Sequence, residues 1–388
     1  MIPPNSVRVD TNWAASSRFQ HENSDLKQTV ESIVHHILST TSIHRRDRLW
    51  PADLLVYSTN PLSFAFGACG TSLLVHDVLQ SLPGDVSSWL RGRRIEGDTY
   101  PPGLYMGLAG IAYSFCELGW IDEAEDALRR VYTSPLRFSD PTMFLGAAGW
   151  GLVSISLQQR TGKWSYIDRA IEAGNYIVKS ANATEYGHCW EDPASARIGF
   201  ARGASGIALF LLRLYQASAD VKYLRHALSG LEFDIAHARG DERRLRWPPS
   251  CNAARTIPFW QAGTSGVGST LIRFARALMD DRLARLSVAA AEGAHVLLAP
   301  SASQFDGLSG IGEFLLDMYL FTGDDEYWSR SLDVAKSIVC YQIRRTEGIA
   351  FAGRGQQRIC TDYGYGSAGV GLFLRRLITL GSRRLHDL

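Results

Sequence analysis

The sequence lacks the features that mark membrane, secreted and nucleic-acid-binding proteins. No apolar run reaches the roughly 20 residues that a membrane-spanning helix needs, and residues 1–20 are polar, so the sequence predicts neither a membrane span nor a secretory signal. The net charge is only +1, and the lysines and arginines are spread along the chain, so no nucleic-acid partner is expected. These absences predict a cytoplasmic protein with no membrane attachment.

Cysteine is scarce as well. Six cysteines are scattered over 388 residues without a Cys-x-x-Cys pair, which argues against a disulfide scaffold and predicts reduced, mostly buried thiols. The chain also has no glycine-rich nucleotide loop and no kinase signature. Any phosphoryl transfer would therefore have to occur elsewhere.

One motif is abundant: Gly-x-x-Gly followed by about ten mostly apolar residues. Repeats at a spacing of roughly 40–60 residues are typical of helical pairs. The first glycines of the seven copies are Gly67, Gly107, Gly146, Gly203, Gly263, Gly307 and Gly366.

The residues between the motifs predict pairs of helices. Ile207–Tyr215 is apolar nearly all round, which is typical of a helix buried on every side. Ser218–Ala227 then supplies a turn and a more amphipathic helix. Seven such pairs with a return to the start predict an all-α fold, an α/α toroid of seven inner and seven outer helices over residues 46–388. Residues 1–45 lack the repeat and are expected to form an extension or linker helix packed on the outside.

The glycines alone indicate architecture, so the chemistry must come from the residues that precede them. If each motif begins an inner helix, these residues lie on loops at one face of the ring, where a rigid scaffold can carry a site. Only three of the seven residues that directly precede a first glycine are polar: Arg202, Asp306 and Tyr365.

From about residue 45 to 380, the sequence resembles the lanthionine synthetase C-like family. The resemblance is carried by the seven repeats, by Phe259–Gly266, where the family has Trp-Cys-x-Gly, and by Phe305–Gly310, where it has Cys-His-Gly. It implies a sevenfold α/α toroid. It also implies addition of peptide cysteine thiols to dehydrated serine or threonine in a ribosomally made precursor peptide.

In zinc-dependent members of that family, two cysteines and one histidine bind the metal. The matching positions here are Gln261, Phe305 and Asp306, and one carboxylate cannot hold zinc alone. The chain is therefore similar to the zinc-less cyclase domain of class III lanthipeptide synthetases, and residues 47–53 resemble the start of that domain. The resemblance implies no metal or other cofactor, and kinase and lyase domains or proteins as partners.

The resemblance also suggests catalytic positions. The family's active-site histidine matches Arg202, its acidic residue matches Thr142, and the nearest counterpart of its arginine is Arg255. A guanidinium such as Arg202 can lower the pKa of a thiol or stabilise an enolate oxygen, while Asp306 or Tyr365 can move the proton.

His188 joins these candidates because it lies in Tyr186–Asp192, the other concentration of reactive side chains. A relocated zinc site that uses His188, Cys189, Cys251 or Cys360 is the weaker interpretation, since adjacent side chains do not easily reach one metal.

Structural roles for the same residues stay open at this point. Arg202 and Asp306 can pair with each other in place of zinc, and Tyr365 can serve as an aromatic wall. Two other functions also remain: a non-catalytic scaffold that binds the precursor peptide or a kinase or lyase partner, and a glycan-active enzyme. The second would use the carboxylates of Asp306, Glu313 and Asp362, which lie near the same face in sequence.

Overall fold

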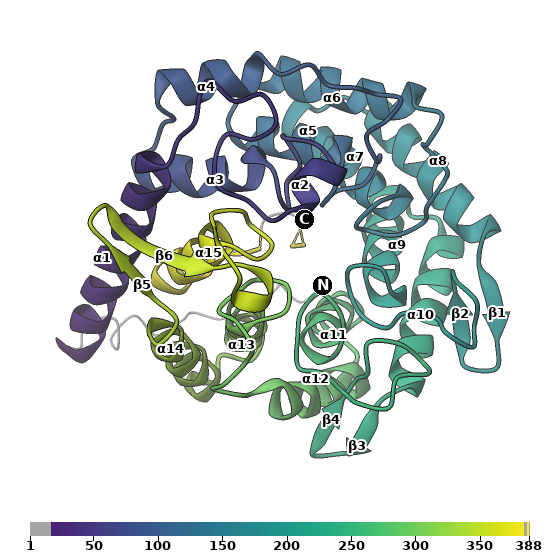
Figure 1. The fold of residues 1–388 in the computed structure, drawn as a ribbon. Helices are drawn as coiled ribbons and strands as arrows, with labels where there is room; N and C mark the ends of the chain where they lie inside the picture. The colour runs from purple at the N-terminus through teal and green to yellow at the C-terminus, as the bar shows by residue number, and fades with distance from the viewer. Residues whose placement is uncertain (1–16, 384–385, 388) are drawn as a thin grey trace.

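The computed structural model shows a closed ring of paired helices (Figure 1) and describes residues 17–383 and 386–387. The inner layer consists of α3 (Ala68–Leu79), α5 (Leu108–Glu117), α7 (Ala147–Thr161), α9 (Ala204–Ser218), α11 (Thr264–Leu278), α13 (Leu308–Thr322) and α15 (Ser367–Thr379). The outer layer consists of α1 (Ser17–Ser39), α4 (Gly84–Arg91), α6 (Ile121–Thr133), α8 (Ser165–Lys179), α10 (Val221–Ala236), α12 (Asp281–Ala294) and α14 (Asp325–Val339). The predicted toroid of seven inner and seven outer helices is confirmed.

The connections carry the remaining elements. The short helix α2 (Leu55–Ser58) precedes the first inner helix, and the 3-10 turn η2 (Arg354–Gln356) precedes the last. Three small antiparallel sheets lie between outer helices and the inner helices that follow them. Their strands are β1 (Asn182–Thr184) with β2 (Gly187–Cys189), β3 (Arg239–Asp241) with β4 (Arg244–Arg246), and β5 (Ile343–Arg345), β6 (Gly348–Ala352) and β7 (Ile359–Cys360).

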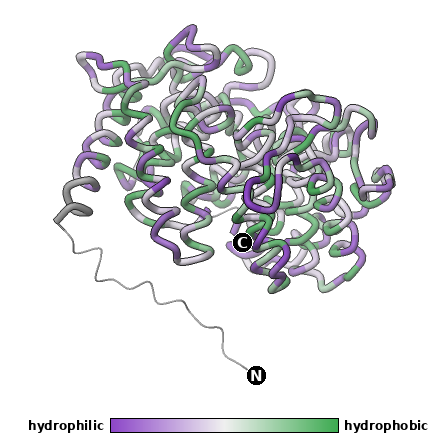
Figure 2. Tube along the Cα trace, turned by 90° about the horizontal axis from the view of Figure 1, so that it is seen from below, coloured by the Kyte–Doolittle hydropathy of each residue, from purple (hydrophilic) through white to green (hydrophobic). Residues whose placement is uncertain are grey.

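The two layers differ in burial as their sequences predict. In α9 every residue from Ala204 to Leu214 is buried, whereas α6 buries only one stripe of residues three or four apart. Figure 2 shows hydrophilic segments at loops and edges and hydrophobic segments running through the packed helices. Among the described residues, no helix combines the length and apolar character needed to cross a bilayer. All six cysteines are free, and four of them are buried.

The loops before the inner helices are joined by a closed ring of backbone hydrogen bonds. The residue two before each first glycine donates its N–H to the carbonyl of the same position in the next repeat, which satisfies backbone groups that would otherwise be buried without partners. The seven N···O distances are 2.8 Å (Ala65 to Tyr105), 3.3 Å (Tyr105 to Phe144), 3.1 Å (Phe144 to Ala201), 2.9 Å (Ala201 to Gln261), 3.1 Å (Gln261 to Phe305), 3.1 Å (Phe305 to Gly364) and 2.9 Å (Gly364 to Ala65).

The second glycine of each motif is required by this close approach. In all seven repeats an added Cβ would meet the carbonyl oxygen of the residue three before the first glycine. At Gly110 the distance would be 1.9 Å, and at Gly310 it would be 2.2 Å. We call the face where the seven inner helices begin the mouth, and the face where they end the rear.

The helix α1 completes the ring from the start of the chain. It packs against α15 and β6, so it fills the outer position of the seventh pair. The predicted extension of residues 1–45 lies partly outside the described residues, and its described part contains α1. The domain boundary at residue 45 stays a prediction.

Candidate functional site

Three polar side chains from neighbouring repeats meet at the mouth. The hydroxyl of Tyr365 lies 3.2 Å from Oε1 of Gln261 and 3.3 Å from Oδ2 of Asp306. Gln261 precedes α11, Asp306 precedes α13 and Tyr365 precedes α15, so the ring of backbone hydrogen bonds sets their spacing. The structure thus brings together two of the predicted catalytic residues.

The shared contact places the carboxyl of Asp306 within hydrogen-bond distance of the Tyr365 hydroxyl. Burial raises the pKa of Asp306, although the hydrogen bond from Tyr365 and the charge of Arg354 oppose that rise. Tyr365 has one proton to donate. When Asp306 is ionised, the Tyr365 hydroxyl donates its hydrogen bond to the carboxylate of Asp306. When Asp306 is protonated, its carboxyl group donates to the oxygen of Tyr365, and the Tyr365 hydroxyl donates to Oε1 of Gln261. The two states differ only in where protons lie.

Arg202 supplies an unpaired cation to the same face. Its side chain is half-buried before α9 and makes no hydrogen bond or ion pair with any described residue. Burial and the charge of Arg197 lower the pKa of Arg202, and the charges of Asp140, Glu191 and Tyr365 act in the opposite direction. The structure shows no ion pair between Arg202 and Asp306, so the guanidinium is available to an anion.

Two residues of the site escape the sequence pattern. Arg354 of η2 lies over the ring of Tyr365, with its guanidinium carbon 5.5 Å from the ring centre, and its Nη2 is 3.4 Å from Oδ1 of Asp53. Both lie in irregular connections at no fixed distance from a glycine pair. No local signal in the sequence identifies them.

A third residue of the site, Asp140, lies close in sequence to a position that the family resemblance had marked. The position matched to the family's acidic residue is Thr142, which is buried and donates from Oγ1 to Oδ1 of Asp140 at 2.5 Å. The carboxylate in this part of the mouth therefore belongs to Asp140, two residues upstream, and it acts on Arg202.

The structure places the other two predicted site residues elsewhere. His188 lies on β2, whose hairpin packs against the outer helix α10, and its ring stacks on that of His226 with centroids 4.9 Å apart. Arg255 is exposed on the loop between β4 and α11. Neither side chain joins the cluster of Gln261, Asp306 and Tyr365, because outer-layer packing holds His188 and solvent surrounds Arg255.

The residues at the family's zinc positions do not fit a zinc ion. Phe305 offers no lone pair, and the amide of Gln261 is a poor ligand beside the single carboxylate of Asp306. The described residues contain no group of three or more His, Cys, Asp or Glu side chains placed to hold a metal. Burial also raises the pKa of Cys189 and that of Cys251, which disfavours the thiolates that a relocated zinc site would need.

Phe305 instead forms the centre of an aromatic layer across the ring axis, and its ring is fully buried. Because rings at these separations are in contact, the layer forms the floor of the mouth. The centroid distances from Phe305 are 6.0 Å to Phe66, 5.8 Å to Tyr105, 5.1 Å to Phe144, 6.0 Å to Trp260, 5.9 Å to Tyr363 and 5.6 Å to Tyr365.

The three acids expected for glycan chemistry do not face one another. Asp362 accepts backbone N–H groups from Asp53 at 2.9 Å and Tyr365 at 2.8 Å, so it holds loops together. Glu313 points toward the rear, where it is hydrogen bonded to Arg376. A pair of facing carboxylates, which glycoside hydrolysis needs, is therefore missing from these residues.

Comparison with known sequences identifies the family to which this chain belongs. Residues 117–387 match the family model for lanthionine synthetase C-like protein. A probable SapB synthase of Streptomyces coelicolor is 27% identical over 358 residues, which are 89% of this chain and 37% of that protein. The chain thus spans well under half the length of this relative.

Solved structures share the architecture at low identity. A nisin cyclase is 14% identical with a TM-score of 0.61, covering 91% of this chain and 94% of its own. A sugar epimerase from a ruminal bacterium is 12% identical with a TM-score of 0.55 over 93% of this chain and 99% of its own. An α-1,2-mannosidase from Trichoderma reesei is 12% identical with a TM-score of 0.55 over 94% of both chains. At such identities the likeness shows the fold alone.

Proposed function

Because this chain belongs to the lanthionine synthetase C-like family, we propose that it is a zinc-independent cyclase that forms thioether rings in a dehydrated precursor peptide. The observation that carries the proposal is the contact of the Tyr365 hydroxyl with both Gln261 and Asp306, at positions matched to metal ligands, beside the unpaired Arg202. Protein groups at the mouth can thus supply both a proton carrier and a cation.

Asp306 acts as the general base in this mechanism. It accepts the proton of a peptide cysteine, and the raised pKa of Asp306 brings its basicity closer to that of a thiol, which eases the transfer. The resulting thiolate attacks the β-carbon of a dehydroalanine or dehydrobutyrine. A carbon–sulfur bond forms, and the π electrons of the double bond move to the carbonyl oxygen as an enolate.

Arg202 stabilises the enolate by facing the oxygen on which charge develops. Asp306 then returns its proton to the α-carbon, so the addition consumes no external reagent. Tyr365 orients Asp306 through their hydrogen bond. The positive charge of Arg354 lowers the pKa of Asp306 and so favours its ionised form. The fixed geometry of the mouth supplies the remaining rate gain by holding the two peptide groups together.

The substrate must arrive already dehydrated, because the chain has no nucleotide-binding loop. We therefore propose kinase and lyase domains or proteins as partners that phosphorylate the precursor peptide and eliminate the phosphate.

One experiment separates this cyclase from a non-catalytic scaffold. The chain is incubated with a dehydrated, cysteine-containing peptide, and free thiol is measured over time against the peptide alone. A cyclase consumes thiol faster than the spontaneous reaction, and Arg202→Ala with Asp306→Asn removes the acceleration. Peptide binding with an unchanged thiol rate would instead establish a scaffold, as would full activity in the double variant.

A further inference from the structure

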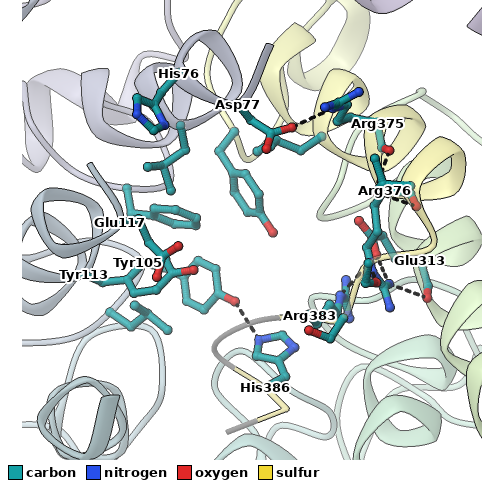
Figure 3. A pocket seen from close by; sticks show the side chains of 18 of the residues that line it. His76, Asp77, Tyr105, Tyr113, Glu117, Glu313, Arg375, Arg376, Arg383 and His386 are labelled. Atoms are coloured by element: carbon teal, nitrogen blue, oxygen red, sulfur yellow. Dashed lines mark hydrogen bonds and ion pairs between the residues drawn. The ribbon is translucent and has the colours of Figure 1, made fainter. Parts of the chain in front are cut away.

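A cavity of about 320 Å³ opens at the rear of the ring (Figure 3), and Tyr105 and Tyr363 of the aromatic layer are among its lining residues. It lies between the last turns of α3, α5 and α15 and the segment that follows α15. Two of its lining residues, Gln80 and Thr379, are exposed, so the cavity reaches the surface. Its volume suits a small organic molecule.

The inner end of the cavity is aromatic and has a free donor. The rings of Phe64 and Tyr363 lie 4.5 Å apart, and Tyr105 lies 5.6 Å from Phe64. The hydroxyl of Tyr363 has no hydrogen-bond partner among the described residues. Burial raises the pKa of Tyr363, so its phenol stays neutral and can donate a proton to a ligand.

The wall formed by α15 and the following segment is cationic (Figure 3). Arg376 is fully engaged with Glu313 and Asp317. Arg383 is less engaged: its Nε lies 3.3 Å from Glu313 and its Nη1 lies 3.7 Å from Asp317 in ion pairs, but Nη1 and Nη2 make no hydrogen bond within the described part of the chain, although the side chain is only 8% exposed.

His386 adds a further unpaired nitrogen to this wall. Its Nε2 lies 3.4 Å from the hydroxyl of Tyr105, whereas Nδ1 is buried without a partner among the described residues. Buried donors without acceptors are costly, so Arg383 and Tyr363 together favour a ligand that brings acceptor oxygens.

A buried network of arginines and carboxylates lies behind this wall, while Asp77, paired with Arg375, and Glu117 line other parts of the cavity (Figure 3). The buried network contains one more cation than anions among the described residues. Burial and the charge of Arg273 lower the pKa of Arg213 to about 10, whereas carboxylates outweigh burial and raise the pKa of Arg273 and that of Arg376, so the excess positive charge lies nearest Arg213. The groups counted are Arg213, Arg273, Arg376 and Arg383 against Glu313, Asp317 and Asp387.

From these contacts we infer that the rear cavity binds a small organic anion, with a carboxylate received by Arg383 and Tyr363 and an apolar or aromatic body packed on Phe64 and Tyr105. This site is independent of the proposed cyclase chemistry, because the layer around Phe305 closes the axis between the two faces.

The test uses 4-fluorophenylacetate as the probe and fluorine NMR as the readout. The whole chain should bind this acid. The neutral 4-fluorophenylacetamide should bind at least roughly tenfold more weakly, since only the acid offers a charged acceptor. Tyr363→Phe keeps the ring and removes only the free hydroxyl, and it should weaken acid binding. Arg383→Gln should weaken it more.

Two further variants locate the site. Leu372→Trp fills the cavity from α15 without touching its polar groups and should abolish binding, while Arg202→Ala at the mouth should leave it unchanged. Circular dichroism and the melting temperature check that each variant is folded. Equal binding of acid and amide overturns the anion assignment. Binding that survives Leu372→Trp, or that is lost in Arg202→Ala, overturns the location, and so does an absence of binding to the folded wild-type chain.

Discussion

Replacing Tyr365 with phenylalanine should move the acid limb of the cyclisation profile to higher pH. In the proposed mechanism Asp306 works as a carboxylate, so activity rises as the pH passes through its pKa. Burial raises that pKa, whereas the hydrogen bond from Tyr365 and the charge of Arg354 lower it. Loss of the hydroxyl leaves burial less opposed, so the pKa of Asp306 in the variant rises further.

The size of the shift follows from the length of the hydrogen bond. A hydrogen bond to a charged group contributes about 1.5–3 kcal/mol, and about 1.4 kcal/mol corresponds to one pH unit. The oxygens of Tyr365 and Asp306 are 3.3 Å apart, which is long for such a bond. The lower end applies, and we expect a shift of about one pH unit.

The assay follows thiol loss from a dehydrated peptide between about pH 4 and pH 9, with the spontaneous rate subtracted at each pH. Arg354→Gln should shift the limb in the same direction. Tyr223→Phe, which removes a hydroxyl bonded to Asn175 in the outer layer, should not. Asp306→Asn should lower the rate roughly 10²–10⁴-fold. An unmoved limb in Tyr365→Phe, together with a wild-type profile in Asp306→Asn, would refute the reasoning.

Three other substitutions test separate parts of the structure. Arg202→Ala should lower kcat/KM roughly 10²-fold by removing the charge that faces the enolate. The melting temperature should change little because Arg202 has no partner among the described residues. A large loss of stability would contradict the assignment of Arg202 as a free cation. Gly310→Ala should destabilise the chain by about 3 kcal/mol, because the new Cβ would lie 2.2 Å from the carbonyl oxygen of Gln304, whereas Gly84→Ala, with no atom within 4 Å of its Cβ, should be neutral in the same urea titration. Burial raises the pKa of Asp234 and that of Asp362 to about 7, so the native state binds more protons than the unfolded state between about pH 4 and pH 7, and stability should fall as pH rises through that window. Asp234→Asn should make this slope shallower, and an unchanged slope would show that Asp234 does not contribute to it.

The fold was predictable because its main constraint is steric and local. Each second glycine avoids a carbonyl oxygen that a Cβ would strike, so a residue type at fixed spacing reports a packing requirement directly. The seventh outer helix was less accessible to sequence reasoning. It comes from α1 at the start of the chain, and only closure of the ring places it beside α15.

The same reasoning explains which of the predicted residues lie together at the mouth. Asp306 and Tyr365 stand at a fixed offset from a glycine pair, so the repeat fixes their place. Arg354 reaches the site from an irregular loop, and its position depends on how that loop packs. His188 lies apart from them because it belongs to a hairpin that packs against the outer helix α10.

Phe305 has two effects: it occupies a position where the family has a zinc ligand, and its ring closes the axis between the mouth and the rear. Its ring is fully buried, so truncating it to a ligand-sized side chain would open a hole at a cost of about 3–5 kcal/mol. The Tyr365 hydroxyl would still lie between residues 261 and 306, where the metal would have to sit. The replacements at the three ligand positions therefore act as one structural unit with Tyr365. The same unit seals the axis, so a peptide at the mouth and an anion at the rear would meet separate sets of side chains, and variants of one set can leave the other intact.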